Sequence, residues 1–185
     1  FELIILGLLF PLTIVFLKFS QFILLFLWFV SIYSIIILTT FYRNKFTLKS
    51  VLYVNLYENK SYLYIIIIRW FLLSFCLFLL TYYIFPSKLF LIQESNADLL
   101  YKIFILYPFL SALPQEFIFC TFFFIRYESL FKNEKNIVFA SAIVFCFAHI
   151  FSINLVAPLL SIFGGFIFAT TFKKTRSLIL VSIEH

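Results

Sequence analysis

Long apolar stretches separated by short polar links make up most of this chain. A helix needs about 20 apolar residues to cross a membrane, and several of these stretches approach or exceed that length. The predicted segments cover residues 1–17, 21–42, 62–85, 101–125, 137–153 and 154–172, and a seventh begins at Leu178. The fifth and sixth meet near Asn154 with almost no link. The pattern therefore predicts an all-α fold, a polytopic transmembrane helical bundle.

Composition supports the membrane class and argues against a soluble domain. Hydrophobic residues make up 64% of the chain and charged residues 12%, with a mean hydropathy of +1.12, whereas a soluble domain has about 45–50% and 25%. Cys76, Cys120 and Cys146 lie in apolar segments without metal-ligand spacing, and for Cys76 and Cys146 this favours small buried side chains. Because position 1 is not Met and position 185 falls within an apolar run, we expect residues 1–185 to form one membrane-embedded domain that is a fragment at both ends.

The basic residues alternate between the links, as the positive-inside rule predicts. Ten lie in the 43–61, 126–136 and 173–177 links, and three lie in the links on the other side. The first three links are therefore predicted to be cytoplasmic, in a multi-pass protein of the cell membrane. The net charge of +6 is read as this topology signal, with the lipid bilayer and no nucleic acid as partner. The 43–61 link could form an interfacial helix, and the 86–100 link is the expected exterior loop.

Five ionisable residues fall inside the apolar segments at similar predicted depths. At a rise of 1.5 Å per residue, Glu116 lies about 15 Å from the basic edge, His149 about 21 Å, and Arg69 and His185 about 13–14 Å; Glu184 is adjacent. Taken singly, each has an ordinary explanation: a hydrogen-bonded core histidine, an arginine that extends to the surface, or a glutamate paired with a basic neighbour. Together, a carboxylate and two imidazoles at one depth form an acid–base set.

Pro114 gives Glu116 an unusual local context. Proline removes a helix donor and leaves a carbonyl that needs another partner, and Pro108 repeats this effect. A kinked helix with Glu116 just past the kink could form the wall of a wet cavity. The alternative is a simple bend with Glu116 paired to Arg69. We expect Arg69 to point inward and to pair with Glu116 or Glu184.

The motifs around these residues resemble those of the CPBP family, the CAAX-protease and bacteriocin-processing (Abi) group of intramembrane metalloproteases. The family pattern is Glu-Glu-x-x-x-Arg on one helix, Phe-x-x-x-His on the next and a His-x-x-x-Asn-type motif two helices later. The counterparts here are Gln115-Glu116-Phe-Ile-Phe-Cys120, Phe145-Cys-Phe-Ala-His149, and His185. The resemblance covers about Pro108 to the end and implies an eight-helix core, truncated here at the C-terminal end.

The resemblance implies intramembrane endopeptidase activity, in which activated water hydrolyses a membrane-associated protein or peptide, in some members near a prenylated C-terminal cysteine. On this interpretation Glu116 is the base, His149 holds the water with it, and His185 is an oxyanion donor. Gln115, Arg69 and Glu184 support the site or position the substrate. The sequence departs from the motif at Gln115 and Cys120. Since Cys120 is four residues after Glu116, an arginine there could pair with the carboxylate, and we expect this cysteine not to.

Three further interpretations remain open from the sequence. Two histidines and a glutamate are residue types that can bind zinc, but the His-Glu-x-x-His pattern is absent. The sequence therefore assigns no cofactor and no metal ligand, and a bound zinc ion stays open as the alternative. Gln115 and Cys120 favour a non-catalytic family member that acts as a bacteriocin-immunity or membrane-interaction protein. A small secondary transporter is less favoured, because no inverted repeat is visible.

Overall fold

The computed structural model describes residues 1–54, 58–150 and 156–185. Within these ranges the chain is helical and has no strand, which confirms the predicted all-α class. The π-helical elements are η1, η4 and η5, and the 3₁₀ elements are η2, η3 and η6. In chain order the elements are α1 (Glu2–Ile4), η1 (Ile5–Leu9), α2 (Phe10–Phe16), η2 (Ser20–Phe22), α3 (Ile23–Phe41), α4 (Leu48–Leu52), α5 (Lys60–Ile84), η3 (Pro86–Lys88), α6 (Leu91–Ser95), α7 (Ala97–Tyr107), η4 (Pro108–Ala112), α8 (Leu113–Glu116), η5 (Phe117–Phe122), α9 (Phe123–Tyr127), η6 (Glu128–Leu130), α10 (Glu134–Phe147), α11 (Val156–Thr175) and α12 (Leu178–Glu184).

Each predicted apolar segment contains helix, and four helical stretches among the described residues are long and apolar enough to cross a membrane. These are Ser20–Phe41, Lys60–Ile84, Ala97–Leu130 and Val156–Thr175. The third begins earlier and ends later than the predicted 101–125 segment. It begins early because the Asn96 side chain caps it, accepting a hydrogen bond from the N–H of Leu99 at 3.0 Å. The expected junction at Asn154 lies outside the described residues.

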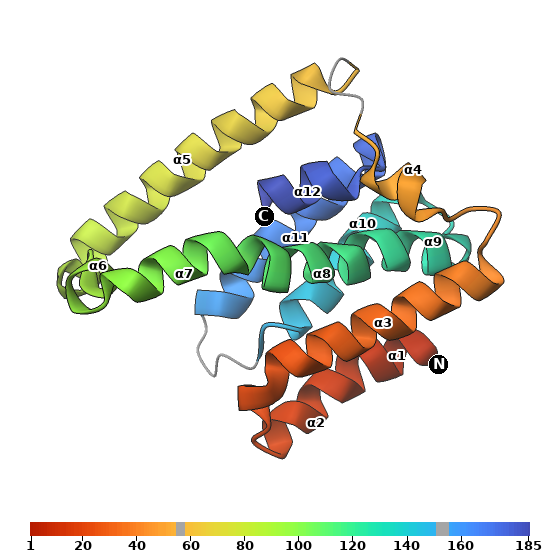
Figure 1. Ribbon diagram of the computed structural model, residues 1–185, viewed down its shortest axis with the longest axis horizontal. Coiled ribbons are helices and arrows are strands. Elements are labelled where there is room, and N and C mark those ends of the chain that lie inside the picture. The colour runs from red at the N-terminus through yellow and green to blue at the C-terminus, as the bar shows by residue number, and fades with distance from the viewer. Residues whose placement is uncertain (55–57, 151–155) are drawn as a thin grey trace.

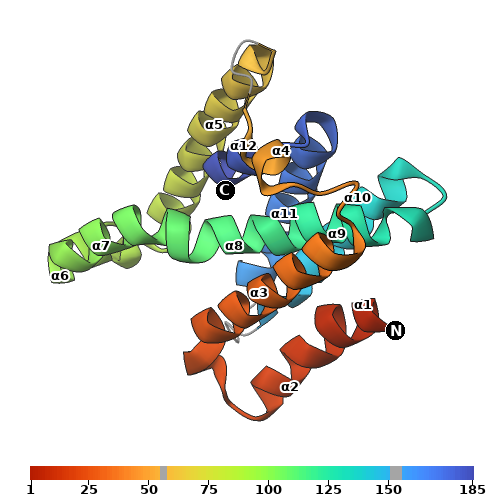
Figure 2. The same cartoon turned by 45° about the vertical axis from the view of Figure 1, so that its right-hand side comes forward.

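Two helical hairpins and one outlying helix surround a long central helix. The central helix runs from α7 through α8 to α9 (Figure 1). The elements α1 and α2 fold back along α3 on one side of it, and α10 packs closely along α11 behind it (Figure 2). Helix α5 diverges from the central helix, and α12 lies between α5 and α8 in both views. The C-terminal residues therefore meet the middle of the central helix.

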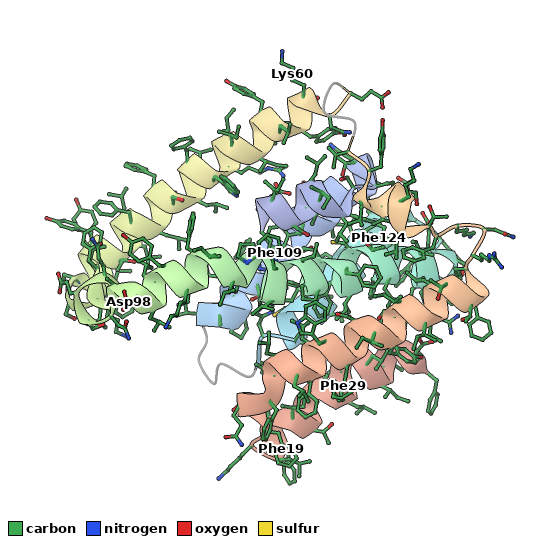
Figure 3. All side chains as sticks on the ribbon, viewed as in Figure 1. Phe19, Phe29, Lys60, Asp98, Phe109 and Phe124 are labelled. Atoms are coloured by element: carbon green, nitrogen blue, oxygen red, sulfur yellow. The ribbon has the colours of Figure 1, made fainter. Side chains whose placement is uncertain are left out.

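Helix α5 is covered by little of the protein. Its single buried residue is Ile66, and large apolar side chains such as Phe71 and Tyr83 are 75% and 76% exposed. Side chains stand out along this helix from Lys60 onward (Figure 3). So much exposed apolar surface is unsuited to water and matches hydrocarbon. The expected solvent for this helix is therefore lipid.

The packed core lies between α9, α10 and α11. The rings of Phe124 and Phe172, both buried, pack edge to face with centroids 5.3 Å apart. Gly165 lets α11 approach α10: a Cβ at this position would lie 3.1 Å from Ala142 Cα and 3.1 Å from the Phe145 Cβ. Small residues permit such close approach between membrane helices. This contact also fixes Phe145, one turn before His149.

The central helix continues through both prolines by changing its hydrogen-bond pattern. Pro114 has no N–H to offer Leu110 O, and the Trp28 indole donates to that carbonyl at 3.1 Å. In η5 the N–H of Phe123 donates to Ile118 O, and Phe119 O accepts the Ser141 hydroxyl at 2.7 Å. The freed carbonyl expected at Pro114 is thus present and is satisfied by a neighbouring helix. The π-helical turns carry the helix past the prolines without a break.

The ion pairs formed by residues of the basic links lie at one end of the bundle. Arg126 binds Glu2 at 2.6 Å, Arg176 binds Glu128 at 2.7 Å, and Lys173 binds Glu134 at 2.7 Å. The Lys173 ammonium lowers the pKa of the exposed Glu134 carboxyl through a hydrogen bond and its charge. In the described part of the 43–61 link, the expected interfacial helix is reduced to the short α4, which begins at a Thr47 cap.

Candidate active site

The fully buried carboxylate of Glu116 binds the ring of His185. Oε1 of Glu116 lies 2.6 Å from His185 Nδ1, and the Glu116 side chain is 0% exposed. Glu116 ends α8 on the central helix, and His185 comes directly after α12. The chain reverses between α11 and α12 through Arg176, whose φ is 50°, and the Ser177 side chain caps α12. This reversal brings the C-terminal histidine back to the middle of the bundle.

Aromatic rings hold the imidazole of His185 in one orientation. The Phe168 ring stacks on it with centroids 4.8 Å apart and an interplanar angle of 12°. Phe145 and Tyr107 contact it edge to face, at 5.8 and 5.9 Å. The Tyr107 hydroxyl lies 3.0 Å from His185 Nε2. Both ring nitrogens of His185 therefore have a hydrogen-bond partner.

Cys120 occupies the other side of the Glu116 carboxylate. Its thiol donates to Glu116 Oε2 at 3.1 Å, so the expectation that this cysteine would not pair with the carboxylate is wrong. The thiol is a weak neutral donor, whereas an arginine at this position would bring a positive charge. Glu116 thus has both oxygens engaged by protein groups and has no exposed surface.

Arg69 binds Glu184, one of its two expected partners. Its Nη1 lies 2.6 Å from Glu184 Oε1 and 3.1 Å from Thr171 Oγ1, and the arginine side chain is 34% exposed. The neighbouring Trp70 indole donates to the Glu184 carbonyl at 3.0 Å. These contacts join α5 to the end of α12. Because Glu184 directly precedes His185, they also hold the backbone that carries the histidine.

An apolar pocket of about 340 Å³ lies on the opposite side of the central helix. The N-terminal hairpin, with Leu6, Phe10 and Leu27, forms one wall. The rest of the lining carries five polar side chains among apolar ones: Tyr107, Ser111, Gln115, Tyr127 and His149. The volume lies at the lower end of the range for small-molecule pockets. Glu116 and His185 are not part of this lining.

His149 and Gln115 present different chemistry to this pocket. His149 Nδ1 lies 2.8 Å from Phe145 O, and since a carbonyl oxygen only accepts, Nδ1 carries the proton. In the neutral ring Nε2 is then an acceptor. The Gln115 amide donates to Ser111 Oγ at 2.7 Å, and its Oε1 is buried without a hydrogen-bond partner among the described residues.

The predicted site residues thus divide into two groups around the central helix. Glu116, His185, Glu184 and Arg69 are joined by contacts on one side, while Gln115 and His149 line the pocket. Phe145 connects the groups, because its ring contacts both His149 and His185, at 4.5 and 5.8 Å. Within the described parts of the chain, the two histidines bond to other partners and not to each other.

Two residues of this region were missed at the level of sequence. Tyr107 and Ser111 precede Gln115 by eight and four residues, the spacing of one helical face. A polar stripe at this spacing on an apolar helix was the signal that could have found them. Tyr107 is the more consequential, because it lines the pocket and also contacts His185.

Zinc does not fit the described residues. Among them no group of three or more His, Cys, Asp or Glu side chains is arranged to hold a metal ion. The Glu116 oxygens are taken by His185 and Cys120, and His149 stands on the pocket wall. No step is therefore assigned to a metal.

Comparison with protein families gives one finding for the C-terminal half of the chain. Residues 97–185 match the family model described as Type II CAAX prenyl endopeptidase Rce1-like. The match confirms the resemblance to the CPBP family drawn from the motifs around Glu116, His149 and His185. No curated protein and no solved structure matches the chain.

Proposed function

We propose, because residues 97–185 match the Rce1-like group of type II CAAX prenyl endopeptidases, that the protein is an intramembrane endopeptidase. Its substrate is a membrane-associated protein or peptide. The observation that best supports this activity is the hydrogen-bonded pair of His185 and the fully buried Glu116, beside a pocket that His149 lines. A carboxylate that orients an imidazole is a recurrent arrangement in enzymes that activate a nucleophile.

In the proposed reaction the pair acts as the base in place of Glu116 alone. Glu116 cannot meet water directly, since it has no exposed surface and both oxygens are engaged. The carboxylate holds the Nδ1 proton of His185, so Nε2, whose partner is the Tyr107 hydroxyl, is the ring atom that accepts a proton. The resulting imidazolium is stabilised by the carboxylate, and its Nε2–H faces the Tyr107 oxygen. His185 thus acts here as a proton acceptor, which differs from the oxyanion role that the motif resemblance implies.

His149 and Gln115 hold the reacting groups in the pocket. The Nε2 atom of neutral His149 accepts a hydrogen bond from the attacking water, and the Gln115 side chain, held by Ser111, forms part of the wall against which the substrate lies. The apolar lining from the N-terminal hairpin suits an extended hydrophobic segment or a prenyl chain. Water adds to the scissile carbonyl carbon, the C–N bond breaks, and the leaving amine takes up the proton.

Cleavage of a defined peptide in proteoliposomes tests this function. The substrates are two peptides of one sequence, with and without a prenyl group on a cysteine near the C-terminus. We expect the wild-type chain to release a C-terminal fragment, and to release it faster from the prenylated peptide because that chain fills the apolar pocket. Absence of cleavage of both peptides by correctly folded protein would contradict the proposal.

A second function, that of a non-catalytic immunity or membrane-interaction protein, is favoured by one observation. Gln115 faces the pocket where the family motif has a glutamate, and an amide cannot take up a proton from water. If the protein is catalytic, Gln115→Glu is expected to change the rate by less than about tenfold, since the Glu116–His185 pair already supplies the base. The matched control is Gln93→Glu in α6. Cleavage seen only with Gln115→Glu would identify the wild-type chain as the non-catalytic form.

The proposed location is the cell membrane, with the chain crossing it several times and the basic end in the cytoplasm. The four long apolar helices and the ion-paired end that carries Arg126, Lys173 and Arg176 support this orientation. We expect Lys132→Cys to be protected from an impermeant thiol reagent in intact cells, and Ser95→Cys to be labelled. Labelling of position 132 from outside would reverse the orientation.

A further inference from the structure

Tyr107 is the one described side chain that both lines the pocket and hydrogen-bonds the buried Glu116–His185 pair. The base proposed above therefore lies behind the pocket wall, and the phenol stands between it and the substrate. We propose that the Tyr107 hydroxyl is a catalytic residue that carries the proton between His185 Nε2 and the reacting water. The inference rests on the proposed peptidase function and names the group that connects its two halves.

The hydrogen bonds along this chain have a defined direction. The ionised Glu116 can only accept, so it receives the Nδ1 proton of His185 across 2.6 Å. Nε2 of the neutral ring is then an acceptor, and the Tyr107 O–H donates to it across 3.0 Å. The phenol oxygen has two lone pairs; Ser111 lies within hydrogen-bonding reach of it, and the other lone pair remains for a water in the pocket. Carboxylate, imidazole and phenol thus form one chain that ends at the substrate side.

The surrounding aromatic rings hold the His185 imidazole in the orientation that these hydrogen bonds need. Phe168 stacks on the imidazole and Phe145 meets it edge to face, so rotation of the ring away from Tyr107 would break both contacts. Tyr107 is the last residue of α7, directly before the π-helical turn η4. That turn contains Pro108, which restricts the backbone beside the phenol.

The proton transfers balance over one cycle. As the water oxygen adds to the scissile carbonyl carbon, a water proton passes to the Tyr107 oxygen and the phenol proton passes to His185 Nε2. The imidazolium is held by the Glu116 carboxylate. When the C–N bond breaks, His185 returns its proton to the phenol oxygen, and the phenol gives one to the leaving amine. Glu116, His185 and Tyr107 end in their starting states.

The other polar groups of the pocket wall cannot replace the phenol in this role. Ser111 accepts a hydrogen bond from Gln115, and neither is bonded to His185 among the described contacts. His149 donates through Nδ1 to Phe145 O and is left with one acceptor that suits binding of water. Of the five polar side chains in the lining, Tyr107 alone contacts His185 Nε2 among the described contacts.

Replacement of the phenol by a ring without the hydroxyl tests the relay. Tyr107→Phe is expected to lower kcat about a hundredfold with KM unchanged, since it removes a proton-transfer step and keeps the ring. The matched control is Tyr101→Phe, six residues earlier on α7 and 69% exposed, which should leave kcat within twofold. A Tyr107→Phe variant with wild-type kcat, or with a change in KM alone, would overturn the inference.

A second measurement detects the hydrogen bond between Tyr107 and His185 without an activity assay. The chain has two histidines, so ¹⁵N-histidine labelling in nanodiscs gives two rings, and a His149→Gln sample identifies the His185 signals. We expect Tyr107→Phe to shift the Nε2 resonance of His185 and to leave its Nδ1–H in place. Unchanged His185 signals would overturn the relay even if the wild-type protein cleaves peptides. Absence of wild-type cleavage would refute the function and the relay together, and the spectra would then report only on the hydrogen-bonded chain.

Discussion

Glu116→Gln is expected to reduce kcat for peptide cleavage about 10³–10⁴-fold, the effect of removing the carboxylate behind a catalytic histidine. The amide keeps the volume of the buried side chain but carries no charge to stabilise the His185 imidazolium. Its NH₂ group can also donate to Nδ1, which would place the ring proton on Nε2 and remove the acceptor that the reaction needs. Steady-state kinetics in proteoliposomes with the prenylated peptide measure this loss.

The matched control for this change is Glu134→Gln. Glu134 is a glutamate at the ion-paired end of the bundle, its side chain is 73% exposed and its partner is Lys173, so the same substitution there should leave kcat unchanged. A thermal unfolding curve for both variants shows whether each is folded. If folded Glu116→Gln kept more than a tenth of the wild-type kcat, the carboxylate would have no role in the reaction.

Gly165→Leu is expected to destabilise the helical hairpin of α10 and α11 by about 3 kcal/mol, the upper part of the range for overpacking. Even a Cβ at this position would meet the Ala142 backbone and the Phe145 side chain at 3.1 Å. The two helices must therefore separate. Since Phe145 contacts both His149 and His185, cleavage should fall together with stability. Unfolding by denaturant in micelles, monitored by circular dichroism, measures the first effect.

The neighbouring glycine provides the control for this prediction. At Gly164 a Cβ would meet only the Phe168 ring, at 3.3 Å, and the far end of a side chain can move. Gly164→Ala should therefore be neutral or gain up to about 1 kcal/mol from helix propensity, whereas Gly165→Ala should lose stability despite the same gain. Equal effects at the two positions would show that the close approach of α10 and α11 is not required.

Much of the architecture is encoded in local sequence. Apolar runs of helical length specify the class and the seven segments, because a membrane leaves an isolated chain segment little choice but helix. The alternation of basic links agrees with the ion pairs that gather at one end of the bundle. Pro114 predicted an unpaired carbonyl, and the structure supplies Trp28 as its donor. The three motif residues Glu116, His149 and His185 could be named as candidates because ionisable groups in hydrocarbon are costly.

The rotation of each residue about its helix axis was decided by the tertiary structure. Depth can be calculated from the rise per residue, but the face cannot, because each π-helical turn adds a residue and rotates the rest of the helix by about 100°. Two such turns flank Glu116. Between these two turns, Glu116 points to His185 while Gln115 points to the pocket. Cys120, within the second turn, still reaches the Glu116 carboxylate. The sequence predicted which groups lie at a similar depth; the packing of α12 and the N-terminal hairpin against the central helix determined which of them is enclosed and which lines the pocket.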